Sequence, residues 1–328
     1  MASTAFQTFQ DLMQRNAYAE AAALADREAL AARPGDAFWF SQLARALLRM
    51  KSWHEARRAA EKALEIQPGN GWALLALGEA LFGAQETEKA LDAFERAASA
   101  ADARVQSRGR EKACECLLRL KQWERLRAEA SAAGLAEKER LRFEAHALHG
   151  MKRLDEAREA CRQWLAAAPD NRGALWLSTE IDIETDGLEA VRERMGRLAK
   201  IPSRPPVYAE IYASLCRRAG VAGAAITQYD KLQSRGDAGR AMRQKAFLLA
   251  KSGQEAEAVA IMEELLRIDP ADMYLHRAYG AACGRIGALE RAVAFYTELA
   301  AANPGDKRLL GRRHALEKKL TKADDGTA

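Results

Sequence analysis

The sequence lacks the features that mark most membrane and disulfide-rich proteins. It has 8 prolines and 5 cysteines in 328 residues, and the cysteines form no C-x-x-C pair with a second pair behind it. This spacing favours a reducing compartment over a zinc or disulfide framework. There is no uncharged apolar run of about 18 residues, and the first residues show no basic segment followed by an apolar one. We expect a soluble, cytoplasmic protein.

Catalytic motifs are also missing from the sequence. There is no glycine-rich phosphate loop and no G-x-S-x-G elbow, and His54 and Glu55 are followed by Arg58 instead of a second histidine. His146 and His149 share one helix face, but two histidines without a nearby carboxylate or thiolate make an incomplete metal site. We predict that the protein is not an enzyme and that it binds no metal, no cofactor and no small-molecule substrate.

Charge of either sign is not in large excess over the whole chain. The 51 lysines and arginines against 46 acidic residues give a net charge of +5, which does not by itself indicate a polyanionic partner. Two segments, 104–127 and 307–322, are nevertheless basic, with net charges of +5 and +6. The bases of the first segment, called the basic patch, are Arg104, Arg108, Arg110, Lys112, Arg119, Lys121, Arg125 and Arg127.

What the sequence does contain is a repeat. Pro34 and Pro68 are 34 residues apart, as are Pro270 and Pro304, and Pro169 lies three periods from each inner proline. Small and large apolar residues recur between the prolines, as in the series Leu77, Gly78, Leu81, Ala90, Phe94 and Ala97, and again in Tyr279, Gly280, Cys283, Gly287, Ala292 and Tyr296. The pattern predicts helix-turn-helix units throughout the chain.

This pattern resembles the tetratricopeptide repeat family, whose 34-residue units stack into a superhelix. The resemblance implies an all-α, right-handed superhelical solenoid of about nine units over 3–306, a capping helix over 307–320 and a disordered tail over 321–328. The predicted units start at residues 3, 37, 71, 107, 138, 172, 206, 239 and 273. We expect altered packing in the fourth unit, which is irregular in length, and in the sixth, where Asp182 takes a packing position.

In the family, one face of each first helix packs against its neighbours and another lines a concave groove. Aromatic residues and arginines, which commonly anchor interfaces, fall on the predicted groove positions. The predicted groove residues are Phe38, Arg45, Trp72, Phe82, Arg142, His146, Trp176, Arg240, Arg243, Phe247, Tyr274 and Arg277. The alternative is that some of these aromatic residues pack against the adjacent unit and have a structural role.

The sequence therefore predicts a protein-protein interaction scaffold or adaptor that holds an extended or helical segment of a partner in its groove. The alternative is a nucleic-acid binder that uses the two basic segments, although acidic groove residues such as Glu79 and Glu180 would repel phosphates. A carboxylate clamp of the co-chaperone type needs asparagines at set helix positions of successive units. It is not expected, because the four asparagines of the chain fall in turn or loop positions: Asn16, Asn70, Asn171 and Asn303.

Overall fold

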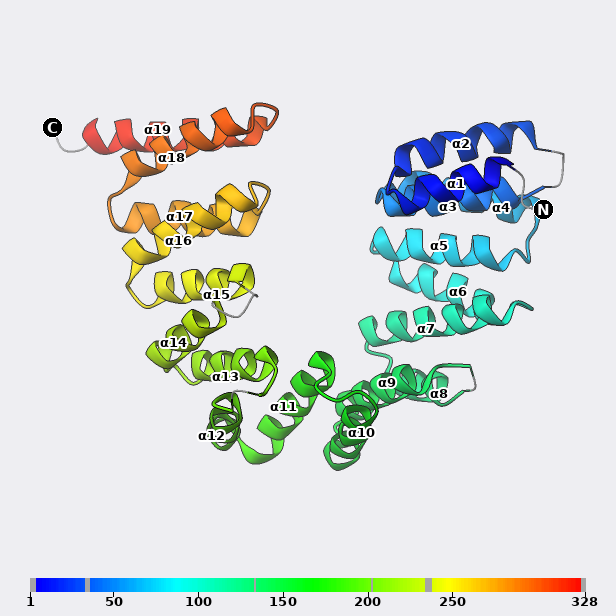
Figure 1. Ribbon diagram of the computed structural model, residues 1–328, viewed down its shortest axis with the longest axis horizontal. Helices are drawn as coiled ribbons and strands as arrows, with labels where there is room; N and C mark the ends of the chain where they lie inside the picture. Colours follow the sequence, from blue (N-terminus) through cyan, green and yellow to red (C-terminus); the bar gives the residue numbers. More distant parts are fainter. Residues whose placement is uncertain (1–3, 33–35, 133, 202, 234–237, 326–328) are drawn as a thin grey trace. The chain divides into compact units, whose positions relative to one another are not determined.

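A computed structural model describes residues 4–32, 36–132, 134–201, 203–233 and 238–325, and these form nineteen α-helices and no strand. The all-α solenoid expected from the repeat is confirmed. The chain forms two compact units, Met1–Ile181 and Asp182–Ala328, which we call the N-terminal and C-terminal units. Within each unit, consecutive helices pack in pairs and consecutive pairs stack (Figure 1). In the part of the chain that the structure describes, no helix is long and apolar enough to cross a membrane.

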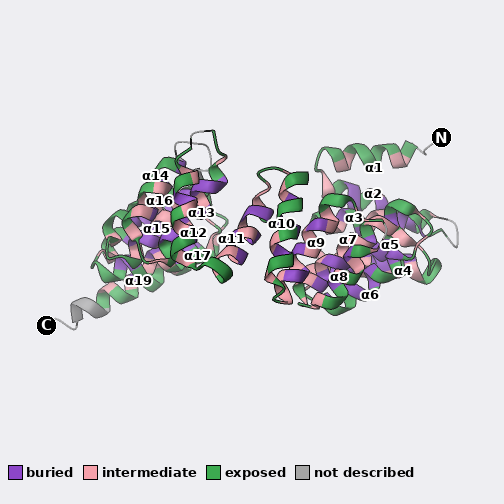
Figure 2. Cartoon of the chain, turned by 90° about the horizontal axis from the view of Figure 1, so that it is seen from below, coloured by how far each residue is buried: buried purple, intermediate pink, exposed green. Residues whose placement is uncertain are grey.

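The N-terminal unit contains five complete pairs. They are α1 (Thr4–Gln14) with α2 (Tyr18–Ala31), α3 (Phe38–Arg49) with α4 (Trp53–Ile66), α5 (Gly71–Gly83) with α6 (Thr87–Ala98), α7 (Ala103–Arg119) with α8 (Trp123–Ser131), and α9 (Glu137–Gly150) with α10 (Leu154–Ala167). Small residues sit where paired helices touch, so that Ala56, Ala60 and Ala63 of α4 are fully buried. At the free end of the unit, α1 buries only Phe9, and Figure 2 shows its other residues partly or fully exposed.

α11 (Arg172–Asp186) begins in the N-terminal unit and ends in the C-terminal unit. Its first part packs Ala174, Leu177 and Ile181 into the core of the N-terminal unit. The division falls directly after Ile181, in a segment where acidic residues alternate with Ile181 and Ile183. Asp182, at the packing position that the sequence singled out, forms an ion pair with Arg194 of α12 instead of joining an apolar core.

The C-terminal unit is also built of packed helices. Its helices are α12 (Leu188–Ala199), α13 (Pro206–Arg218), α14 (Ala222–Gln233), α15 (Ala238–Lys251), α16 (Glu255–Ile268), α17 (Met273–Arg285), α18 (Leu289–Ala302) and α19 (Lys307–Asp325). α19 covers the last pair by burying Leu309 and Leu316. It continues to Asp325 instead of ending at 320, and residues 326–328 of the expected tail lie outside the described residues.

The fourth pair corrects one expectation from the sequence. α7 begins at Ala103, before the predicted unit start at 107, and its packing is not weakened. Val105, Cys114 and Leu117 are buried in the same core as α5 and α6. A β-carbon on Gly109 would lie 2.6 Å from the backbone nitrogen of Ala98, so α6 and α7 are in close contact. The irregular length of this unit reflects a long α7 and a short α8.

Candidate functional site

In the N-terminal unit, the first helices of four pairs line one cavity of about 550 Å³, which we call the N-terminal pocket. α1 contributes Phe6, α3 contributes Phe38, Gln42 and Arg45, α5 contributes Trp72 and Glu79, and α7 contributes Arg104 and Arg108. The pocket thus brings together three predicted groove residues and two residues of the predicted basic patch.

Aromatic side chains that reach solvent form the apolar part of this pocket. Phe38 is 40% exposed and Trp72 is 44% exposed, which is high for large apolar residues on ordered helices. The rings of Phe6 and Phe38 meet edge to face at 5.2 Å. The Arg104 guanidinium lies 5.9 Å from the Trp72 ring centre, so one face of that ring is next to a cation.

The charges of the pocket are only partly paired within the protein. Arg108 donates to Glu79 at 2.7 Å, and Arg104 pairs with Asp102 at 3.3 Å. Arg45 lies 5.1 Å from the Phe9 ring centre and has no carboxylate within ion-pair distance among the described residues. Burial against the pocket wall, and then the positive charge of Arg108, lower the pKa of Arg45 below its usual range. Arg45 is therefore an exposed arginine of the pocket lining that has no carboxylate partner among the described residues.

One polar atom of the pocket lining is also unsatisfied. The Oε1 atom of Gln42 is buried and has no hydrogen-bond partner in the described part of the chain. Gln42 and Arg45 are separated by i, i+3 on α3, so they lie on the same face of that helix. Gln42 is not among the predicted groove residues, although its helical spacing from Arg45 was a usable signal.

Most cations of the predicted basic patch already have partners within the protein. Besides Arg104 and Arg108, three of them pair with carboxylates: Arg110 with Glu129 at 2.9 Å, Lys112 with Glu115 of the same helix at 2.8 Å, and Arg125 with Glu95 at 2.6 Å. Arg119 donates to the side-chain amide oxygen of Gln85. Lys121 is exposed and Arg127 is half-buried. The patch therefore presents far less free positive charge than its sequence suggests.

The C-terminal unit has a second cavity on its first helices, of about 690 Å³, which we call the C-terminal pocket. It is lined by four predicted groove residues, Arg240, Arg243, Phe247 and Tyr274. Tyr274 is 77% exposed. Unlike Arg45, Arg243 is paired, with its Nη1 atom 2.7 Å from Asp272, and Asp272 also caps the N-terminus of α17. Arg277 is exposed but does not line this pocket.

The remaining predicted groove residues join neither pocket. Phe82 is half-buried with Arg119 over its ring at 4.8 Å, and Trp176 is half-buried on α11. Arg142 lies over the ring of Phe143 at 4.8 Å. His146 was predicted to contact a partner, but its ring packs 6.2 Å from that of Trp164, and burial lowers its pKa to about 4.

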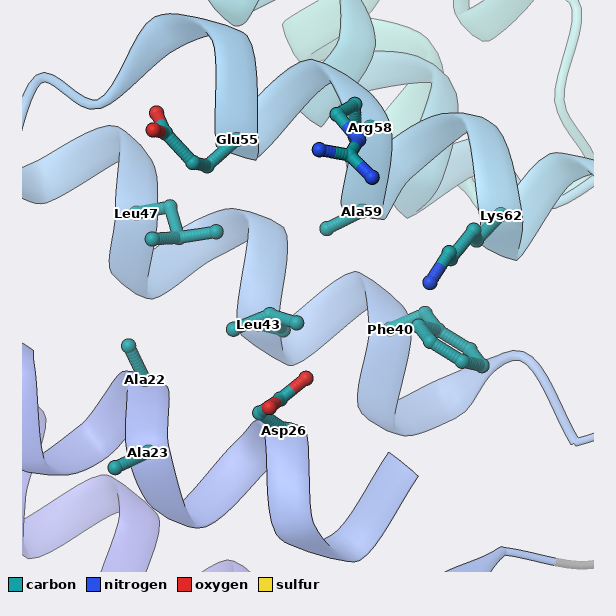
Figure 3. A pocket seen from close by; sticks show the side chains of 10 residues that line it. All are labelled: Ala22, Ala23, Asp26, Phe40, Leu43, Leu47, Glu55, Arg58, Ala59 and Lys62. Carbon is teal, nitrogen blue, oxygen red and sulfur yellow. The ribbon is translucent and has the colours of Figure 1, made fainter. Parts of the chain in front are cut away.

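A third cavity, of about 350 Å³, lies between α2, α3 and α4 (Figure 3). Leu43 and Leu47 form part of its lining, and the Lys62 ammonium lies 5.6 Å from the Phe40 ring centre. Its two acidic residues, Asp26 and Glu55, balance its two basic ones, Arg58 and Lys62. This cavity therefore has no excess charge to select a partner.

Stacked helix-turn-helix pairs with lined pockets on the first helices define a helical repeat protein. Two family models described as tetratricopeptide repeat match residues 47–107 and 184–311, which together span more than half of the chain. The chain belongs to the tetratricopeptide repeat family.

Solved structures to which the chain is similar include a tetratricopeptide repeat protein from Parabacteroides merdae. It is 12% identical, with a TM-score of 0.43 over 86% of this chain and 98% of that one. The C-terminal part of a repeat protein from Cytophaga hutchinsonii is also 12% identical, with a TM-score of 0.48 over 83% of this chain and 98% of that one. No curated protein matches the chain significantly.

Proposed function

We propose that this chain is a non-catalytic scaffold that binds an extended or helical segment of a partner protein on the face formed by its first helices, with the N-terminal pocket as the main site. The observation that carries the proposal is the pair of exposed aromatic rings, Phe38 and Trp72, in a cavity with partly unpaired arginines. Tetratricopeptide repeats in general serve as protein-interaction scaffolds, and this supports a protein as the partner. A reducing, cytoplasmic compartment fits the five cysteines, which are buried and form no disulfide.

Ion pairing favours a protein over a nucleic acid as the partner. Phosphate backbones bind clusters of free lysines and arginines, and affinity then falls steeply with salt. In the basic patch, most of the cations already contact carboxylates or an amide of neighbouring residues. A nucleic acid would have to displace these partners, so we expect a shallow dependence of binding on salt concentration.

The substitution Trp72→Ala tests the proposed site. We expect it to cost about 2 kcal/mol or more in binding, because exposed tryptophans in pockets are typical interface anchors. Binding of a captured partner to the full-length chain is measured by calorimetry, and the free energy of unfolding is measured on the same samples. Leu30→Ala is the matched control, because Leu30 is a large apolar residue of α2 that is 78% exposed and lies outside the pockets.

The opposite balance would contradict the proposal. If Trp72→Ala lowers stability while each folded molecule keeps its affinity, the ring is a structural element and the N-terminal pocket is not the site. A similar loss of binding in Leu30→Ala would show that the partner is held by general surface hydrophobicity.

A further inference from the structure

The charge pattern of the N-terminal pocket gives the chemistry of its occupant. We infer that the partner segment carries an acidic side chain beside a large apolar one, with the carboxylate on Arg45 and the apolar side chain against Phe38 and Trp72. The inference rests on the proposed function, and it adds which kind of segment the pocket selects.

The first step of the argument is the unpaired charge of Arg45. Of the three arginines that line the pocket, Arg104 and Arg108 already pair with Asp102 and Glu79, whereas Arg45 lies against the ring of Phe9 and pairs with no carboxylate among the described residues. The Arg45 side chain is exposed, so its guanidinium is open to a carboxylate from a bound segment and can form charge-assisted hydrogen bonds to it. A neutral or basic segment would not form them.

The second step is the neighbourhood of Arg45. Arg108 is close enough to lower the pKa of Arg45, so a carboxylate there relieves repulsion between two cations. Gln42 lies on the same face of α3, and no hydrogen bond among the described residues holds its Oε1 atom. Gln42 adds an amide whose N–H groups can donate to a carboxylate beside Arg45.

The third step is the apolar wall beside these polar groups. Phe38 and Trp72 lie on adjacent first helices and line the same cavity as Arg45. A cavity of about 550 Å³ takes one large side chain together with a carboxylate-bearing neighbour. The combination selects an acidic residue next to an aromatic or branched aliphatic one.

The C-terminal pocket provides an internal contrast. Arg243, an arginine of its lining, is already bound by Asp272 through both of its terminal nitrogens. The protein supplies there, with its own carboxylate, the partner that Arg45 lacks. The inference therefore applies to the N-terminal pocket alone.

The test selects a phage-displayed library of random dodecapeptides on the full-length chain and repeats the selection on Trp72→Ala. We expect the peptides that depend on Trp72 to be enriched in Asp or Glu next to a large apolar residue. Affinities of the best peptide and of its analogue with Gln or Asn in place of the acid are then measured on wild type, Arg45→Gln and Arg49→Gln. Arg49 is an exposed arginine of α3 outside the pocket and serves as the matched control.

Arg45→Gln should weaken the acidic peptide about tenfold or more, and Arg49→Gln should not. The amide analogue should bind wild type and Arg45→Gln equally, and Arg45→Glu should bind a lysine analogue of the peptide better than wild type does. Peptides that depend on Trp72 but show no acidic enrichment, or no dependence on Arg45, would overturn the inference and leave the proposed function standing. A selection with no Trp72-dependent peptides would overturn both.

Discussion

The turns inside the helix pairs are built differently in the two units. The five turns of the N-terminal unit place a residue other than glycine in the left-handed region, with φ from 57° to 69°, at Asn16, Lys51, Gln85, Lys121 and Lys152. Three turns of the C-terminal unit place glycine at the same point, with φ from 67° to 84°, at Gly220, Gly253 and Gly287. The turn before α12 instead has Gly187 directly before the helix. Glycine adopts this conformation without the penalty that a β-carbon brings. The left-handed residue of the turn therefore carries a conformational penalty in the N-terminal unit that glycine avoids in the C-terminal unit.

Glycines at equivalent helix positions also have different surroundings. Gly78 of α5 and Gly280 of α17 lie equally far from the N-cap residues Asn70 and Asp272. A β-carbon on Gly78 would lie 2.4 Å from the Phe94 ring, whereas one on Gly280 would meet nothing within 4 Å. Equivalent positions in the repeat therefore share a helical backbone but differ in the space available to a side chain. Glycine provides space at Gly78, a left-handed backbone at Gly253, and neither at Gly280.

Gly78→Ala should give the largest effect of the three glycine substitutions. The added methyl group overlaps the ring of Phe94, which is only 1% exposed in the core of α5, α6 and α7 and has no free space to move into. Overpacking of this kind lowers the free energy of unfolding by about 1 to 3 kcal/mol. Urea denaturation followed by circular dichroism measures it. An unchanged midpoint would show that the third pair is as open as the ninth.

The sequence predicted the architecture well because the repeat is a local property. Proline spacing and small residues at helix contacts predicted an all-helical solenoid, and Trp72 and Tyr274 do lie on exposed faces of first helices. The start of the fourth unit was less well placed, because α7 extends toward its N-terminus up to a capping Asp102 that the repeat pattern does not include.

The ion pairing at the candidate site could not be predicted from the repeat pattern. The basic patch looked free in the sequence because its partners come from other helices, as Glu79 does for Arg108 and Glu95 for Arg125. These pairs span nearly one repeat length, so a search for opposite charges one unit apart would have found them. Burial of His146 depends on Trp164 of the paired helix, which no single-helix pattern indicates.

Gly253→Ala should have an intermediate effect that comes from the backbone alone. Gly253 has φ of 84°, and a β-carbon there would meet no atom within 4 Å. We expect a loss of about 1 kcal/mol in the free energy of unfolding, the cost of a left-handed alanine. Lys51→Ala is the control. It also places alanine at the equivalent turn position, but Lys51 already has a β-carbon and a positive φ, so the backbone penalty does not change. If both substitutions changed the free energy of unfolding equally, glycine would give the C-terminal turns no conformational advantage.

Gly280→Ala should have the smallest effect, and its sign should be opposite. Gly280 lies inside α17 with a φ outside the left-handed region, and nothing surrounds the place of its missing β-carbon. Glycine inside a helix costs about 0.5 to 1 kcal/mol relative to alanine, because it leaves the unfolded chain more freedom. The substitution should therefore raise the urea midpoint without changing the slope of the transition. A lowered midpoint would mean that α17 and α18 approach each other as closely as α5 and α6 do. Gly280 would then lack the open space around it, and small residues would be needed at helix contacts in both units alike.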